Sequence, residues 1–170
     1  LTLFRRQSAP KQPAVVPAVI AKWEPSPNFA SRLGVIIDTI VLHNTDGPLG
    51  PSMARLKDPA AQVSAHYMVD RDGSVYQLVK DSDCAWHSGN REVNRKSIGI
   101  EIVAYKTALG MTAEQEQALI NLVRMKVKQY GVTPDNIIPH RKVRSTACPG
   151  WVFPADSDLT AWVDRNVRAA

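Results

Sequence analysis

Two histidines and one cysteine stand where a stiff backbone could hold them as metal ligands. His43 and His140 each close a short apolar run, and Cys148 lies in the tight segment 146–150. Two imidazoles and one thiolate suit zinc, and three protein ligands leave a fourth coordination position for water or substrate. A lone histidine at a strand end is more often structural, but because all three fall at the ends of predicted elements, a catalytic zinc site stands beside that structural interpretation.

Glu101 has the side chain to act as a base at such a site. In residues 98–103, strand alternation puts the isoleucines on one face and Glu101 on the other, and the segment carries no other charge. Burying an unpaired carboxylate costs several kcal/mol, so Glu101 requires either a salt bridge or a catalytic task. Beside zinc, which lowers the pKa of bound water toward about 7, it could take a proton from that water.

Residues 86–90, Trp-His-Ser-Gly-Asn, form a third group of interest. Trp86 and His87 in a glycine-containing loop could present flat and hydrogen-bonding surfaces to a sugar or a peptide. Trp86 could equally fill the edge of the core. His66, at the start of a predicted strand, could line the same cleft or simply pack inside.

Composition is that of an ordinary globular domain. The chain has 170 residues, with 44% hydrophobic and 22% charged residues, which suits one domain with a substantial core. No apolar run approaches the roughly 20 residues of a membrane-spanning helix, so no transmembrane segment is expected.

The charge and the cysteines restrict the partners. A net charge of +5 favours polyanionic partners, such as the polymers of a bacterial wall, or serves solubility alone. Nucleic acid is not expected, because zinc-finger spacing and RNA-binding aromatic motifs are absent from the sequence. The two cysteines, Cys84 and Cys148, could form a disulfide, which would remove Cys148 from a metal site. The pattern favours Cys148 as a ligand and Cys84 as a lone thiol.

Proline-rich residues 1–21 are predicted to be a tail or linker, and residues 22–170 a single domain. Strands are predicted at residues 35–43, 97–104 and 137–139, with a hairpin at residues 66–79 that turns at Asp-Gly. Helices are predicted at residues 52–57 and 159–167. A longer helix runs from Thr112, with Gln115 completing a capping box, to a stop at Gly131. The order predicts an α/β fold, a central mixed sheet flanked by helices, with the zinc site at one edge.

Six segments carry a resemblance to a known family. They are residues 40–45, 63–69, 71–76, 85–89, 97–102 and 139–150. In this order they resemble the zinc-dependent N-acetylmuramoyl-L-alanine amidases of the type-2 group, which include bacterial cell-wall amidases, phage endolysins such as T7 lysozyme, and peptidoglycan recognition proteins. The resemblance covers roughly residues 22 to 165.

The resemblance implies roles for individual residues. His43, His140 and Cys148 would bind one Zn²⁺, and Glu101 would be the base, as in the branch of the family with glutamate in this strand. Ala65 occupies the position where another branch has a catalytic tyrosine. Thr146 stands where many relatives have lysine; it could donate a hydrogen bond to the oxyanion, with charge supplied by zinc, Lys142 or Arg144. Substrate contacts would come from Thr45, His66, Trp86 and His87.

The implied enzyme is a hydrolase, an amidase that cleaves the bond between N-acetylmuramic acid and L-alanine in peptidoglycan or a muropeptide. We expect a monomer that acts in cell wall degradation at the cell envelope, periplasmic or secreted, or as a phage endolysin; an autolysin fits as well, and cytoplasmic recycling fits less. The rival readings are a peptidoglycan-binding module without catalysis and a regulatory protein that uses the same fold.

Overall fold

The computed structural model describes residues 19–169. The predicted tail, residues 1–21, falls almost entirely outside this range, and its last residue, Ala21, is the first residue of a strand. The main sheet has the strand order β1 (Ala21–Trp23), β5 (Val75–Gln77), β4 (Tyr67–Val69), β7 (Ser97–Ile102), β3 (Thr39–Asn44) and β8 (Ile137–Pro139). It is mixed, because β4 and β5 are antiparallel while β3 is parallel to both β7 and β8.

Strand β3 is shorter than predicted. It lies between β7 and β8 and is almost fully buried, as its apolar sequence on both faces indicates. The predicted start at residue 35 is wrong, because Val35 and Ile36 are 41% and 78% exposed and the first residue of the strand is Thr39. β-branched residues favour a strand only where a neighbouring strand pairs with them, and residues 35–38 lie outside the sheet.

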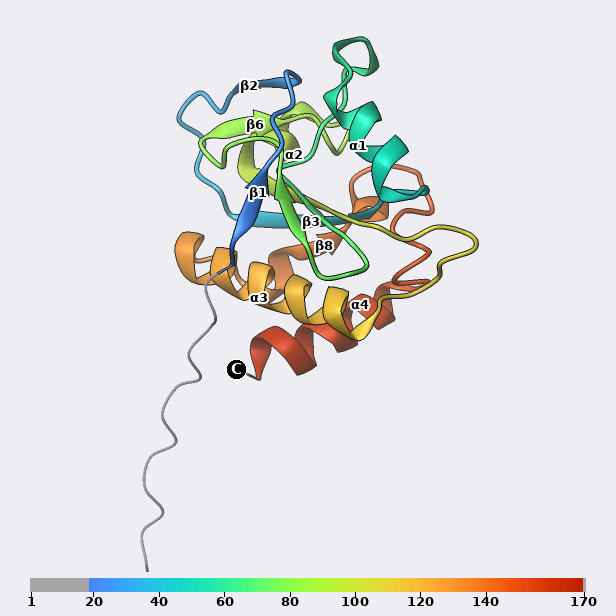
Figure 1. Ribbon diagram of the computed structural model, residues 1–170. Helices are drawn as coiled ribbons and strands as arrows, with labels where there is room; N and C mark the ends of the chain where they lie inside the picture. Colours follow the sequence, from blue (N-terminus) through green and yellow to red (C-terminus); the bar gives the residue numbers. More distant parts are fainter. Residues whose placement is uncertain (1–18, 170) are drawn as a thin grey trace, which may run out of the picture.

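Helices cover both faces of the sheet (Figure 1). α3 (Ala113–Tyr130) and α4 (Asp156–Val163) pack on one face, where they bury the isoleucines of β7 and Ile40 and Leu42 of β3. α1 (Leu49–Lys57) covers part of the other face. Because side chains alternate along a strand, His43 and Glu101 lie on the face toward α1.

The ends of α3 combine a confirmed prediction with a correction. The Thr112 side chain accepts a hydrogen bond from the Gln115 backbone N–H, and Gly131 ends the helix with a φ of 67°. The predicted capping box is wrong, however, because the Gln115 side chain does not reach back to Thr112. It donates instead to the backbone carbonyls of Val69 and Val103, which ties the first turn of α3 to the sheet.

The hairpin β4–β5, strand β8 and the end of α1 before Asp58-Pro59 are as predicted. α1 begins three residues earlier than expected, and β7 ends at Ile102 rather than at residue 104. The last helix also begins earlier, and α4 continues into a π-helical segment, η4 (Asp164–Arg168). The unpredicted elements include β1, the antiparallel pair β2 (Phe29–Ser31) and β6 (Asp83–Ala85), α2 (Arg91–Lys96), and the short 3₁₀ turns η1 (Pro59–Ala61), η2 (Pro134–Asn136) and η3 (His140–Lys142).

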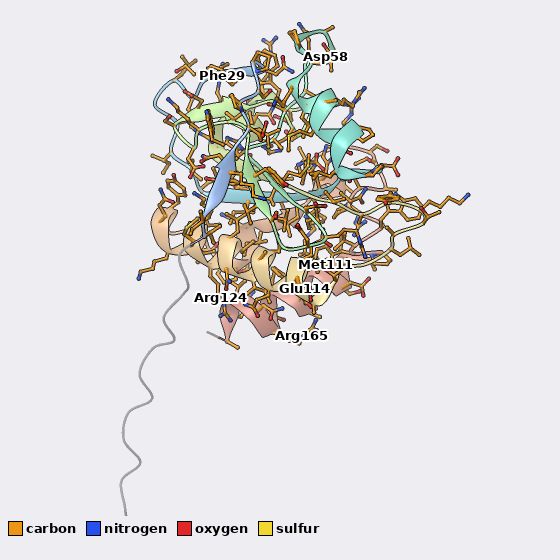
Figure 2. All side chains as sticks on the ribbon, viewed as in Figure 1. Phe29, Asp58, Met111, Glu114, Arg124 and Arg165 are labelled. Atoms are coloured by element: carbon orange, nitrogen blue, oxygen red, sulfur yellow. The ribbon has the colours of Figure 1, made fainter. Side chains whose placement is uncertain are left out.

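Side chains fill the space between the sheet and both helical layers (Figure 2). On the lower side, Arg124 of α3 donates to the backbone oxygen of Asn166 and so joins α3 to the C-terminal helix. Within residues 19–169, none of the helices is long and apolar enough to cross a membrane.

Candidate active site

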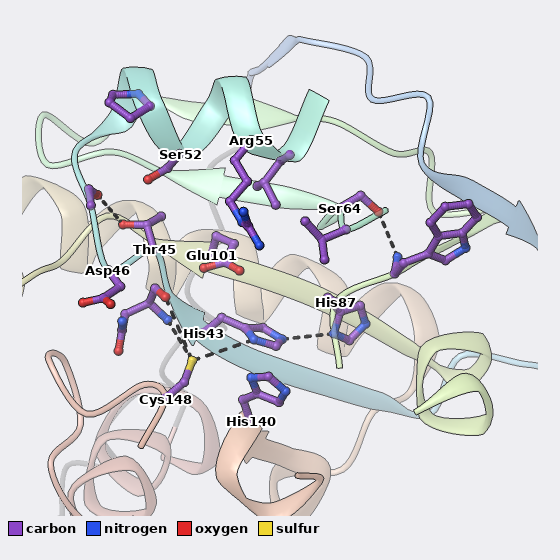
Figure 3. A pocket seen from close by; sticks show the side chains of 16 residues that line it. His43, Thr45, Asp46, Ser52, Arg55, Ser64, His87, Glu101, His140 and Cys148 are labelled. Carbon is purple, nitrogen blue, oxygen red and sulfur yellow. Dashed lines mark hydrogen bonds between the residues drawn. The ribbon is translucent and has the colours of Figure 1, made fainter. Parts of the chain in front are cut away.

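His43, His140 and Cys148 meet at the carboxyl ends of two neighbouring parallel strands. Leu42 of β3 pairs with Pro139 of β8, so the next residues along each strand, His43 and His140, are neighbours, and their ring centroids lie 4.4 Å apart. Cys148 joins them from a loop, with Sγ 3.4 Å from the backbone nitrogen of Asn44. Figure 3 shows the three side chains pointing toward one another.

The three side chains have the spacing and chemistry of a zinc site. Their ligand atoms all lie within 4.8 Å of one another. Cys148 Sγ and His43 Nδ1 are 3.9 Å apart, less than the roughly 4.4 Å that one Zn–S and one Zn–N bond span end to end. Burial raises the pKa of the Cys148 thiol to about 12, with the nearby Glu101 charge adding to the effect. A thiol in this setting becomes a thiolate when a cation binds it, so the donor set fits zinc.

Both histidines are held in the neutral form that metal binding requires. Burial, followed by the charges of His87 and His140, lowers the pKa of His43 well below its ordinary value. Burial also lowers the pKa of His140, whose Nε2 lies 3.1 Å from the backbone oxygen of Ser88.

Glu101 lies beside this cluster with one oxygen unpaired. It is opposite His43 in the register of β7 and β3. Its Oε2 is buried and has no hydrogen-bond partner within residues 19–169, and none of the ion pairs found there includes Glu101, so the salt-bridge reading is not supported. Burial raises its pKa from 4.5 to about 7, which suits a group that exchanges protons near neutral pH.

The cluster opens into a pocket of about 370 Å³. Among the predicted residues, its lining includes His43, Thr45, Trp86, His87, Glu101, His140 and Cys148. The opposite wall comes from α1 and contains Ser52 and Arg55, which the sequence did not single out. In Figure 3 the Arg55 side chain extends from α1 into the pocket above Glu101. The α1 sequence predicts a helix, but not which of its side chains point into this pocket.

His66 does not line this pocket, so its position does not fit the predicted substrate contact. It is fully buried, with Nδ1 3.0 Å from the Gly99 backbone nitrogen and Nε2 2.7 Å from Arg32 Nη2. Burial and then the Arg32 charge lower its pKa to about 3. His66 therefore packs in the interior, the alternative that the sequence left open.

Thr146 lies to one side of the pocket. It is exposed and lines an adjacent hollow of about 310 Å³ together with Asp46 and Trp151. Its hydroxyl oxygen accepts a hydrogen bond from the backbone N–H of Cys148 at 3.2 Å. Lys142 and Arg144, the sequence's other candidates for positive charge, do not line the pocket. Cys84 is buried as a free thiol, so no disulfide competes for Cys148.

A mixed sheet that brings two histidines, a cysteine and an unpaired carboxylate to one pocket is characteristic of a hydrolase that uses a metal ion. The family model described as N-acetylmuramoyl-L-alanine amidase, Amidase_2, matches residues 33–151, and the chain belongs to this family. The resemblance read from the motifs is thereby confirmed.

Individual relatives agree with the family. N-acetylmuramoyl-L-alanine amidase AmiD of Escherichia coli K12 is 30% identical over 155 residues, which cover 75% of this chain and 55% of AmiD. The 1,6-anhydro-N-acetylmuramyl-L-alanine amidase AmpD of Salmonella typhimurium is 32% identical over 113 residues, 63% of this chain and 59% of AmpD. The chain spans about half the length of the first three curated relatives it matches.

Solved structures show the same fold. A crystal structure of AmpD aligns with a TM-score of 0.70 at 27% identity and covers 84% of this chain and 93% of that chain. The complex of E. coli AmiD with the substrate anhydro-N-acetylmuramic acid-L-Ala-D-γ-Glu-L-Lys aligns with a TM-score of 0.58 at 28% identity, over 67% of this chain and 50% of that chain. The predicted fold class, a central mixed sheet flanked by helices, is confirmed.

Proposed function

We propose that this chain is a zinc-dependent N-acetylmuramoyl-L-alanine amidase, which hydrolyses the amide bond between the lactyl group of N-acetylmuramic acid and L-alanine. The observation that carries this proposal is the unpaired Glu101 carboxylate in the same pocket as the cluster of His43, His140 and Cys148. His43, His140 and Cys148 would hold one Zn²⁺. When bound there, zinc would polarise the scissile carbonyl and activate a water molecule.

Glu101 would act as general base and then as general acid. Its pKa of about 7 means that the carboxylate form is well populated at neutral pH, yet basic enough to take a proton from water. As the amide bond breaks, the same proton passes to the nitrogen of L-alanine, which leaves as an amine. Glu101 lines the pocket, and no protein group competes for its buried Oε2 among the described residues, so the carboxylate is available for this task.

We assign the positive charge near the reacting carbonyl to Arg55 rather than to Lys142 or Arg144. Arg55 lines the pocket and points into it from α1, where its guanidinium could stabilise negative charge on the carbonyl oxygen. Thr146 keeps a supporting role in this proposal. Its hydroxyl holds the turn before Cys148 and could donate a hydrogen bond to substrate from the adjacent hollow.

Trp86 and Thr45 are the proposed substrate contacts in the pocket wall. Trp86 is half-buried and offers part of its indole surface to a sugar ring, a common use of aromatic side chains. Thr45 lies two residues after His43, and its hydroxyl donates to the Gly47 carbonyl, which fixes the loop at the rim of the pocket.

We further propose that the protein acts as a monomer on peptidoglycan at the cell envelope, as a periplasmic or secreted amidase or as a phage-encoded lysin. The proline-rich residues that precede β1 keep the proposed role of a tail or linker.

Digestion of purified peptidoglycan tests the proposal. The protein should release free stem peptides with an N-terminal L-alanine, lose this activity to a chelator and regain it with zinc. Glu101→Gln should keep zinc but lose turnover by orders of magnitude. Binding to peptidoglycan without release of peptides would instead identify a non-catalytic binding module.

A further inference from the structure

His87 lies behind a metal ligand, with both of its ring nitrogens engaged by protein groups. Its Nδ1 is 3.0 Å from His43 Nε2, and its Nε2 is 3.0 Å from Ser97 Oγ. The side chain is only 9% exposed. Although His87 borders the pocket, neither nitrogen is free to bind substrate, so the predicted role as a substrate contact does not fit its position.

His43, His87, Ser97 and the backbone carbonyl of Val93 form a series of hydrogen bonds. The donor in each bond follows from the carbonyl at the end of the series. Ser97 Oγ lies 2.6 Å from the backbone oxygen of Val93, which can only accept, so the Ser97 hydroxyl donates to it. Ser97 Oγ can then only accept from His87 Nε2–H. A neutral imidazole carries one N–H, so His87 Nδ1 is an acceptor and receives a hydrogen bond from His43 Nε2–H. His43 Nδ1 is left with its lone pair, 3.9 Å from Cys148 Sγ.

The next residue of the same loop acts on the second histidine. His140 Nε2 lies 3.1 Å from the Ser88 backbone oxygen, which again can only accept, so Nε2 carries the proton and Nδ1 is free. Ser88 is itself fixed, because its backbone N–H and its hydroxyl both donate to Oδ1 of the buried Asn94, at 2.9 and 2.7 Å. His87 and Ser88, which are adjacent in the loop, therefore engage Nε2 of His43 and of His140 and leave Nδ1 of both histidines free to bind a metal.

Gly99 allows His87 to take this position. A Cβ built on Gly99 would lie 2.4 Å from Cγ of His87, well inside any real contact. Its φ is not in the left-handed region, so the need for glycine here is close approach and not backbone conformation. The glycine in β7 thus makes room for an imidazole that lies on the sheet directly behind His43.

We infer that His87 and Ser97 are positioning residues that hold His43 in the Nε2–H tautomer, so that Nδ1 is the atom that binds the metal. This inference deepens the proposed function, because it rests on the same metal site. Outer groups that orient a metal-binding histidine typically contribute about 10- to 100-fold in metal affinity.

Nitrogen NMR of the wild-type protein without metal is the most direct test. The sequence contains four histidines, so their ring signals can be assigned individually. The proposal expects the Nε2–H tautomer for His43 and for His87. The Nδ1–H tautomer of His43 would overturn it. This result does not depend on any variant, on zinc or on activity.

Variants then test the consequence for zinc affinity, measured by competition with a chelator. His87→Leu and Gly99→Ala should each weaken zinc binding about 10- to 100-fold. His87→Asn, whose side-chain oxygen can replace Nδ1 as acceptor, should restore most of the loss. Gly50→Ala is the matched glycine control, since its Cβ meets nothing within 4 Å. Unchanged affinity in a folded His87→Leu protein would overturn the proposal.

The amidase activity and the positioning role of His87 and Ser97 can be refuted separately. A wild-type protein that binds no zinc would overturn the proposed function, while the NMR tautomers would still decide the inference about His87 and Ser97. A protein that binds zinc equally well with and without His87 would leave the amidase proposal intact and overturn the positioning role.

Discussion

Glu101→Gln should stabilise the metal-free protein at neutral and alkaline pH, although it removes the proposed catalytic base. The Oε2 atom of Glu101 is buried and has no partner among the described residues, and burial raises the pKa of the carboxyl from 4.5 to about 7. A charged carboxylate in this position therefore opposes folding.

The sign and size of the effect follow from proton binding. Between pH 4.5 and about 7 the folded protein binds the Glu101 proton more tightly than the unfolded chain, so the free energy of unfolding falls as pH rises through this range. At 1.36 kcal/mol per pKa unit, the loss amounts to about 3 kcal/mol at pH 8 and to about 1 kcal/mol at pH 5. Glutamine does not ionise, so the variant escapes this loss.

Urea denaturation of metal-free protein from pH 5 to pH 8 measures the effect. Relative to wild type, Glu101→Gln should gain about 2 kcal/mol in unfolding free energy over this range. The decisive quantity is how the difference in unfolding free energy between the variant and wild type changes with pH. The new amide also alters the unfolding free energy, but by an amount that does not depend on pH. Glu114→Gln, at an exposed position of α3, is the control and should show little change. A difference between wild type and Glu101→Gln that does not vary with pH would refute the reasoning.

Three further predictions concern other parts of the molecule. Cys148→Ala should lower the zinc-to-protein ratio measured by elemental analysis; an unchanged ratio would remove Cys148 from the ligand set. Arg55→Met should leave zinc content unchanged and lower kcat by about 10²-fold, as loss of an oxyanion-stabilising group does; normal turnover would show that Arg55 has no such role. Lys126→Met should cost about 3 kcal/mol in urea denaturation, because it leaves the largely buried Asp81 carboxylate with only the Tyr67 and Tyr130 hydroxyls as partners; a loss below 1 kcal/mol would contradict this.

The parts of the fold that sequence could predict are those with a long regular pattern. α3 has a cap, an apolar stripe and a glycine stop within the sequence itself, so its ends were predictable. The three-residue strands β1, β2 and β6 are too short to show alternation, and they exist because a distant strand pairs with them. The β-branched residues 35–36 have no such partner, which is why the predicted strand begins too early.

In the candidate site, too, some features follow from the sequence pattern and others depend on contacts between distant residues. His43 and His140 were predictable as neighbours, because strand ends in a parallel sheet converge at one edge, and Cys148 reaches them from a loop. The contacts of His87 were not, since they depend on the space that Gly99 leaves and on the direction of one serine hydroxyl. Arg55 was missed for a related reason. Its helix is visible in the sequence, but the face that looks into the pocket is set by how α1 packs.

Isotope labelling of a defined muropeptide tests the central claim most directly. The zinc-loaded protein would be incubated in H₂¹⁸O with N-acetylmuramic acid linked to its stem peptide, and the products analysed by mass spectrometry. Zinc-dependent hydrolysis of this amide should place one ¹⁸O in the lactyl carboxylate and release an unlabelled peptide that begins with L-alanine, and a chelator should prevent the formation of both products. Label in the peptide, cleavage at another bond, or full activity in the chelator would contradict it.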